Sequence, residues 1–138
     1  MAKPKPETPD KGYLIPNVEL PPLCSSQYHP GAPSDEAQAA ARFLDETLQN
    51  SKCVDLCDLC IVPDVLAWVL HVDIICLNQD GGLLDACVIS AIAALKTVTL
   101  PEVIYDAEKQ QKIVNIDNRK NLRIRSLPIA TTFAVFDR

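Results

Sequence analysis

The run Val65–Leu77, VLAWVLHVDIICL, constrains the fold more than any other segment. Apolar side chains, many of them β-branched, occupy both alternating sets of positions, and only His71 and Asp73 interrupt them. A strand with one wet face would alternate apolar and polar residues. The run therefore predicts a long strand inside a sheet, covered on both faces.

Helical patterns flank this strand. Ser34 or Asp35 can cap a helix that runs to about Asn50. Its predicted inner stripe consists of Ala39, Ala40, Phe43, Leu44, Glu46, Thr47 and Leu48. The turn residues Gln79–Gly82 tolerate positive φ and lead into a second helix, LLDACVISAIAALKT. The small residues predicted to let this helix pack closely are Ala86, Ser90, Ala93 and Ala94.

Shorter strands are predicted toward both ends of the chain. Tyr13–Ser26 contains Pro16, Pro21 and Pro22, which lack an amide donor, so it predicts a short edge strand followed by irregular chain. Turn residues such as Asp117-Asn118 separate the strands predicted after Pro101. Those strands are Val103–Tyr105, Ile113–Ile116, Leu122–Arg125 and Ile129–Phe136.

Composition indicates one globular domain, because 48% of the residues are hydrophobic and 22% are charged. We expect residues 1–12, rich in proline and lysine, to be a flexible segment before a domain over 13–138. The net charge of −5 would repel a polyanion, so any RNA contact needs a local basic patch. With no bilayer-spanning run and no signal-peptide pattern, we expect a soluble intracellular protein without membrane partners.

The spacing Cys53-x3-Cys57-x2-Cys60 matches the cysteines that hold a four-iron cluster in radical S-adenosylmethionine enzymes. Those enzymes surround the cluster with a large barrel, and this chain has too few residues and no glycine-rich cofactor motif. We therefore expect chance spacing of free thiols, with no metal, no cofactor and no disulfide among the six cysteines. An iron–sulfur enzyme is the weaker alternative.

Two other patterns have a chemical and a structural interpretation. His71 and Asp73 project from one face of their strand and could form an acid–base pair, but no nucleophile is identifiable beside them, so mutual hydrogen bonding is favoured. Asp80-Gly81-Gly82 could cradle a phosphate at a helix N-terminus, yet a turn into a helix needs glycine in any case. We interpret it as a turn.

Positive charge concentrates at Arg119, Lys120, Arg123 and Arg125. In an extended segment Arg119, Arg123 and Arg125 lie on one side, which makes the cluster the best candidate for contacts with an RNA backbone. No aromatic residue is interleaved for base stacking, and solvated charges at a strand edge are the alternative interpretation.

Several motifs in fixed order resemble the non-catalytic RNase PH-like ring subunits of the eukaryotic RNA exosome, of the component-eight type. The motifs are DKGYLIPNVELPPLCSS (10–26), DLCI (58–61), DGGLLDAC (80–87), AALK (93–96), LPEV (100–103) and TFAVFD (132–137). Motifs in order are more specific than any one alone. The resemblance implies an α+β fold: a partial RNase PH-like domain with ribosomal-protein-like βαβ units and helices packed on a mixed sheet.

The resemblance also implies a function. In the family, RNase PH-like domains form a ring that threads single-stranded RNA, capping subunits lie above it, and separate nucleases degrade the RNA. The expected role is thus structural support of 3′–5′ processing, including rRNA maturation and mRNA turnover, in the nucleus, nucleolus and cytoplasm. The expected partners are the other ring subunits, the cap subunits and single-stranded RNA.

The alternative function is an active phosphorolytic 3′–5′ exoribonuclease. Active relatives carry arginines near the start of the first helix, where this chain has Ser25, Ser26, Gln27, Tyr28 and His29. Without those donors an orthophosphate clamp is not expected, so no catalytic residue is assigned.

The family pattern also continues beyond both ends of this sequence. The chain therefore resembles a truncated or spliced form, incomplete at both ends of the domain. Apolar surface that the remaining strands would cover is expected to be exposed and to favour partners or aggregation.

Overall fold

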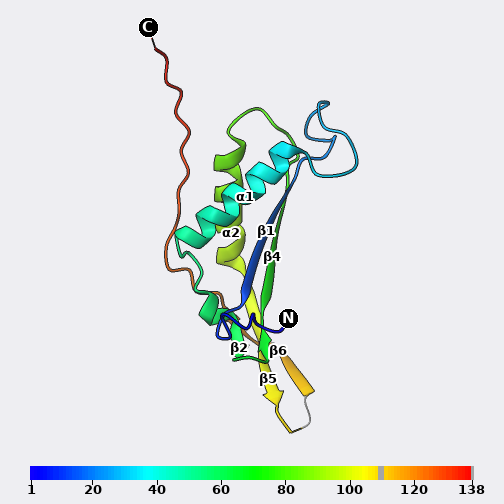
Figure 1. Ribbon diagram of the computed structural model, residues 1–138, viewed down its shortest axis with the longest axis vertical. Coiled ribbons are helices and arrows are strands. Elements are labelled where there is room, and N and C mark those ends of the chain that lie inside the picture. The colour runs from blue at the N-terminus through cyan, green and yellow to red at the C-terminus, as the bar shows by residue number, and fades with distance from the viewer. Residues whose placement is uncertain (109–110, 138) are drawn as a thin grey trace.

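The computed structural model describes residues 1–108 and 111–137 (Figure 1). Helices and strands both occur, which confirms the α+β prediction. The elements are β1 (Tyr13–Glu19), α1 (Asp35–Asn50), the 3-10 helix η1 (Leu56–Leu59), β2 (Cys60–Val62), β3 (Leu66–Ala67), β4 (Val69–Ile75), α2 (Leu83–Thr97), β5 (Thr99–Asp106) and β6 (Gln111–Asn121).

A βαβ unit forms the centre of the molecule. Strands β1 and β4 pair in parallel, from Tyr13 opposite Val69 to Glu19 opposite Ile75, and α1 lies between them in the sequence. Helix α1 packs on β1 and on α2, and α2 also contacts β4. Figure 1 shows the two helices crossing beside the strand pair. Parallel strands need such a crossover, which the helix supplies.

The predicted long strand over Val65–Leu77 is wrong in two respects. The chain is divided at Trp68 into β3 and β4, because the Trp68 amide bonds to the Leu59 carbonyl at 2.8 Å while its own carbonyl accepts from Tyr13 at 3.0 Å. In β4 only Val72 is buried, and the residues facing the other way are exposed: His71, Asp73 and Ile75. Within the described residues, β4 is covered on one face only.

Local signals for both helices are confirmed. The Ser34 hydroxyl accepts a hydrogen bond from the Ala37 amide at 3.2 Å and caps α1. Gly81 and Gly82 have φ angles of 89° and 64°, in the left-handed region that glycine adopts without strain, and α2 starts directly after them. The turn interpretation of Asp80-Gly81-Gly82 therefore agrees with the structure.

The buried faces of the helices differ from those predicted. The α1 residues that are buried are Ala37, Ala40, Leu44 and Leu48. Ala39, Phe43 and Glu46 are exposed instead, because a stripe of helical period cannot include all the positions predicted. In α2 the buried residues are Cys87, Val88, Ala91, Ile92 and Leu95. Ala86, Ser90, Ala93 and Ala94 lie on the exposed side, so the small residues predicted to allow close packing are not the ones that do so.

Strands β5 and β6 form an antiparallel hairpin that projects from the rest of the molecule (Figure 1). The predicted turn at Asp117-Asn118 lies inside β6. The register shifts between Pro101, opposite Arg119, and Glu102, opposite Asn115, so the intervening residues bulge. The Asp117 amide bonds to the Asn115 side-chain oxygen at 3.2 Å, which is a turn-like contact within the bulge.

The strands predicted over Leu122–Arg125 and Ile129–Phe136 are not formed. Leu122 bonds to the Val98 carbonyl, and Ile124 makes a single bridge to Val54. The chain beyond Ser126 is extended and leads away from the helices (Figure 1), and Phe133 and Phe136 are 83% and 88% exposed. A strand requires a partner along its length, and within the described residues none lies beside this segment.

The N-terminal residues contact the body of the domain. The Ala2 backbone pairs with Ala67, and the Gly12 amide bonds to the Leu56 carbonyl at 2.8 Å. The flexibility of residues 1–12 and the boundary at 13 stay predictions. Across the described ranges, neither helix has the length and apolar character needed to cross a bilayer.

Candidate nucleic-acid interface

The four basic residues of the predicted cluster lie in different surroundings. Arg119 and Lys120 belong to β6, where Arg119 Nε bonds to the Ile116 carbonyl at 3.2 Å and Lys120 Nζ lies 3.6 Å from Glu102. Arg123 and Arg125 follow β6 and are exposed, while Leu122 and Ile124, which alternate with them, turn inward. Exposed and inward-facing residues thus alternate over residues 122–125, and a side shared with Arg119 stays a prediction. Of the four basic residues, Lys120 and Arg123 border a common hollow.

That hollow has a volume of about 450 Å³, and we call it the Trp68 pocket. Its polar lining includes Lys120, Arg123 and Asn121, opposed by Asp58 and Glu102. Trp68, half-buried, forms part of the wall. Proteins that bind single-stranded nucleic acids combine an aromatic side chain, on which a base stacks, with cationic side chains that contact the backbone.

Sequence reasoning missed Trp68 as a member of this site. It lies between β3 and β4, far along the chain from Lys120, and the tertiary structure brings them together. The only available signal was that Trp68 is the single tryptophan of the chain and occurs in an otherwise aliphatic run.

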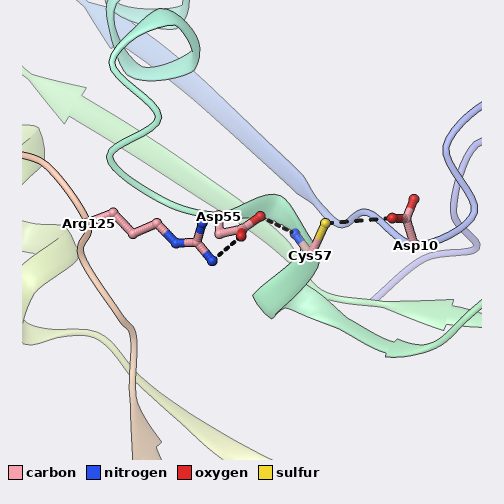
Figure 2. Close-up of polar contacts among 4 residues, drawn as sticks. All are labelled: Asp10, Asp55, Cys57 and Arg125. Atoms are coloured by element: carbon pink, nitrogen blue, oxygen red, sulfur yellow. Dashed lines mark hydrogen bonds and ion pairs between the residues drawn. The ribbon is translucent and has the colours of Figure 1, made fainter.

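Arg125 lies outside the Trp68 pocket and contacts Asp55 instead. Its guanidinium forms an ion pair with Asp55, whose carboxylate also accepts a hydrogen bond from the Cys57 amide at 3.0 Å (Figure 2). The Cys57 amide lowers the pKa of Asp55, and the charges of Arg125 and Lys11 lower the pKa further. Asp55 is therefore ionised at neutral pH, and its contribution to stability is lost only as the pH falls through that lowered pKa.

Cys53, Cys57 and Cys60 each contact a different acceptor and not one another. The Sγ of Cys53 lies 3.6 Å from the Leu48 carbonyl, that of Cys57 lies 3.6 Å from Asp10 (Figure 2), and that of Cys60 lies 4.0 Å from the Pro9 carbonyl. Burial and the nearby carboxylate of Asp55 raise the pKa of Cys57, which disfavours the thiolate that metals bind. All six cysteines are free thiols, and no metal-binding cluster occurs among the described residues.

The His71 and Asp73 pair is solvent-exposed on β4. Asp73 accepts a hydrogen bond from the Asn17 side chain at 3.4 Å across the β1–β4 pair, and His71 faces Ile15 in register. The predicted bond between the two is replaced by contacts across the strands, because directly opposed residues are closer than residues two apart.

The segment before α1 forms a polar network in place of an anion clamp. The Tyr28 hydroxyl lies 2.6 Å from the Glu36 carboxylate and also contacts Gln79, whose amide donates to Glu36 at 3.0 Å. Burial and the hydrogen bond to Glu36 raise the pKa of Tyr28, so the phenol stays neutral. A carboxylate at the centre of this network makes it a poor environment for phosphate.

Comparison with known proteins identifies the family to which the chain is similar. Residues 1–101 match the RNase PH description, 3′ exoribonuclease family, domain 1. Exosome complex component rrp43 of Schizosaccharomyces pombe is 40% identical over 137 residues, which are 99% of this chain and 51% of that protein. Exosome complex component Rrp42 of Thermococcus onnurineus is 40% identical over 134 residues, or 97% of this chain and 49% of that protein.

Solved structures give the same result. An Archaeoglobus fulgidus exosome with RNA bound to the active site matches with a TM-score of 0.78 and 38% identity, over 92% of this chain and 46% of that one. An archaeal exosome core matches with a TM-score of 0.69 and 33% identity, over 92% and 43% of the two chains. The chain spans about half the length of the curated relatives it matches. The predicted resemblance is confirmed, and the chain belongs to the RNase PH, or 3′ exoribonuclease, family.

Proposed function

We propose that this chain is a structural subunit of an exosome ring. The observation that carries the proposal is the agreement with an archaeal exosome chain, at a TM-score of 0.78 and 38% identity over 92% of this chain. The role that follows is to support 3′–5′ RNA processing, including rRNA maturation and mRNA turnover, by assembly and RNA threading. Its proposed location is the nucleus, nucleolus and cytoplasm.

Exposed apolar side chains support an assembly role. Large ones lie on β4 and its end, on the β5–β6 hairpin and along the C-terminal segment. Among them are Ile75, Leu77, Ile104, Ile116, Ile129 and Phe133. Apolar surface of this kind favours burial against a partner, and an unpaired strand edge can accept a neighbouring strand. The proposed partners are other RNase PH-like ring subunits and the cap subunits.

The proposed ring subunit has no phosphorolytic activity of its own. Phosphorolysis requires fixed cationic donors for the attacking phosphate. In this chain the segment over Ser25–His29 contains no arginine, and the adjoining polar network is centred on the Glu36 carboxylate.

Assembly is tested by co-purification and by an activity assay on the same material. Tagged chain, co-expressed with the remaining ring and cap subunits, should recover them in near-equal amounts, because the apolar surfaces are buried only in the complex. Purified chain with inorganic phosphate should release no nucleoside diphosphate from oligoadenylate. Recovery of chaperones alone would contradict assembly, and phosphate-dependent shortening of the RNA would establish the alternative, an active exoribonuclease.

RNA contact is proposed for Arg119, Lys120, Arg123 and Arg125, with a base stacked on Trp68 in the Trp68 pocket. Because the chain has one tryptophan, its fluorescence reports on that pocket alone. Oligoadenylate should quench it, and an abasic oligomer of equal charge should not. Removing the side chains in Lys120→Ala/Arg123→Ala should weaken RNA binding about tenfold or more, with a smaller salt dependence.

Lys112→Ala, on the same strand but outside the pocket, is the matched control and should leave the quenching unchanged. Equal quenching by the abasic oligomer would rule out stacking on Trp68. Equal RNA affinity of the double variant and the control would rule out contact by this cluster.

A further inference from the structure

A second pocket, of about 430 Å³, gathers positive charge from distant parts of the chain. Its charged lining consists of Lys11, Lys52 and Arg125, opposed by the single carboxylate of Asp55. Three cations and one carboxylate leave two positive charges in excess, in a chain whose net charge is −5. We call this the Lys52 pocket.

The charges of Arg125 and Asp55 offset each other, and the charges of the two lysines remain. Asp55 forms its ion pair with Arg125, and this fixes the guanidinium at the pocket wall. The ion pairs within the described residues are this one and Lys120–Glu102, so neither Lys11 nor Lys52 forms an ion pair there, although the charge of Lys11 acts on Asp55 at longer range. Concentrated charge of one sign in a hollow attracts an ion of the opposite sign.

Lys52 supplies an independent observation. Its φ angle is 50°, in the left-handed region where a side chain is disfavoured and glycine or asparagine is usual after a helix C-terminus. Its amide bonds to the Gln49 carbonyl at 3.2 Å, so the residue ends α1 in the position that glycine normally takes. A lysine at a backbone position that glycine would occupy without strain points to a use for its side chain beyond folding.

We propose that the Lys52 pocket binds a phosphate group, either inorganic phosphate or a phosphodiester of single-stranded RNA. An arginine fork and two ammonium groups suit a tetrahedral oxyanion better than a planar carboxylate, because several oxygens can be met from different directions. The site lies apart from the Trp68 pocket and needs no neighbouring subunit, so it stands whether or not the chain joins an exosome ring.

Thermal unfolding of the full chain with and without inorganic phosphate, at equal ionic strength, tests the site. Phosphate should raise the Tm of the parent chain relative to chloride. Lys52→Gly should have a higher Tm than the parent without phosphate, because backbone strain is relieved, yet bind phosphate about tenfold more weakly or worse. Lys52→Arg, which keeps the charge, should retain binding.

Asp64→Gly is the matched control, since Asp64 also has a left-handed φ of 63° but does not line the pocket. It should gain stability and keep its response to phosphate. Competition by oligoadenylate without a terminal phosphate would identify the RNA backbone as the source of the anion, and absence of competition would identify free phosphate. No phosphate response in the parent chain, or equal responses in Lys52→Gly and Asp64→Gly, would overturn the proposal.

Discussion

Gly12→Ala is expected to lower the free energy of unfolding by about 3 kcal/mol or more. A Cβ at this position would lie 2.4 Å from the Leu59 Cβ and 2.7 Å from the Trp68 carbonyl oxygen, both far inside normal contact distance. Leu59 is fully buried, and the Gly12 amide is bonded to Leu56, so no atom can move aside without breaking packing or backbone bonds.

Urea denaturation followed by circular dichroism measures this effect as a lower midpoint. Glu7→Ala is the control, because Glu7 is exposed in the same N-terminal segment, and its midpoint should stay close to that of the parent. A midpoint for Gly12→Ala equal to that of the control would mean that residues 10–13 do not pack against η1 and Trp68 as described.

Leu44→Ala is expected to cost about 3 kcal/mol, because Leu44 is 0% exposed in the core cluster and its removal leaves a cavity under α1. Its neighbour Phe43 is 37% exposed, so Phe43→Ala should cost about 1 kcal/mol despite the larger side chain. Chemical denaturation of both variants gives the comparison. A larger loss at Phe43 than at Leu44 would show that α1 presents a different face to the core.

Gly12→Ala and Leu44→Ala both test the packing of the domain, on which the proposed assembly role depends. The Gly12 amide bonds to Leu56 of η1, and the Leu44 side chain packs from α1 into the hydrophobic core. Apolar side chains such as Phe133 and Phe136 are exposed and available for contacts with a partner. Loss of a few kcal/mol is a large part of the usual stability of a domain, so either variant should also reduce recovery of partner subunits.

The local sequence determined the features that depend on neighbours in the chain. Ser34 capped α1, the pair Gly81-Gly82 preceded α2, and the prolines after β1 ended that strand, because caps and turns involve residues a few positions apart. The ordered motifs also identified the family, since they carry more information than composition does. The helical pattern also predicted the burial of Leu44, although the predicted inner face of α1 included residues such as Phe43 that are exposed.

Only the tertiary structure decided which distant segments meet. The run Val65–Leu77 is apolar at both alternating sets of positions except for His71 and Asp73, which share the exposed face of β4. Its division at Trp68 depends on the strands that are present beside it. The sequence predicted one site for the basic cluster near the C-terminus. In the structure Arg125 forms an ion pair with Asp55, whereas Lys120 lines a pocket with Trp68. Contacts between residues far apart in sequence leave no periodic signal along the chain, and it is these contacts that place the charges of both pockets.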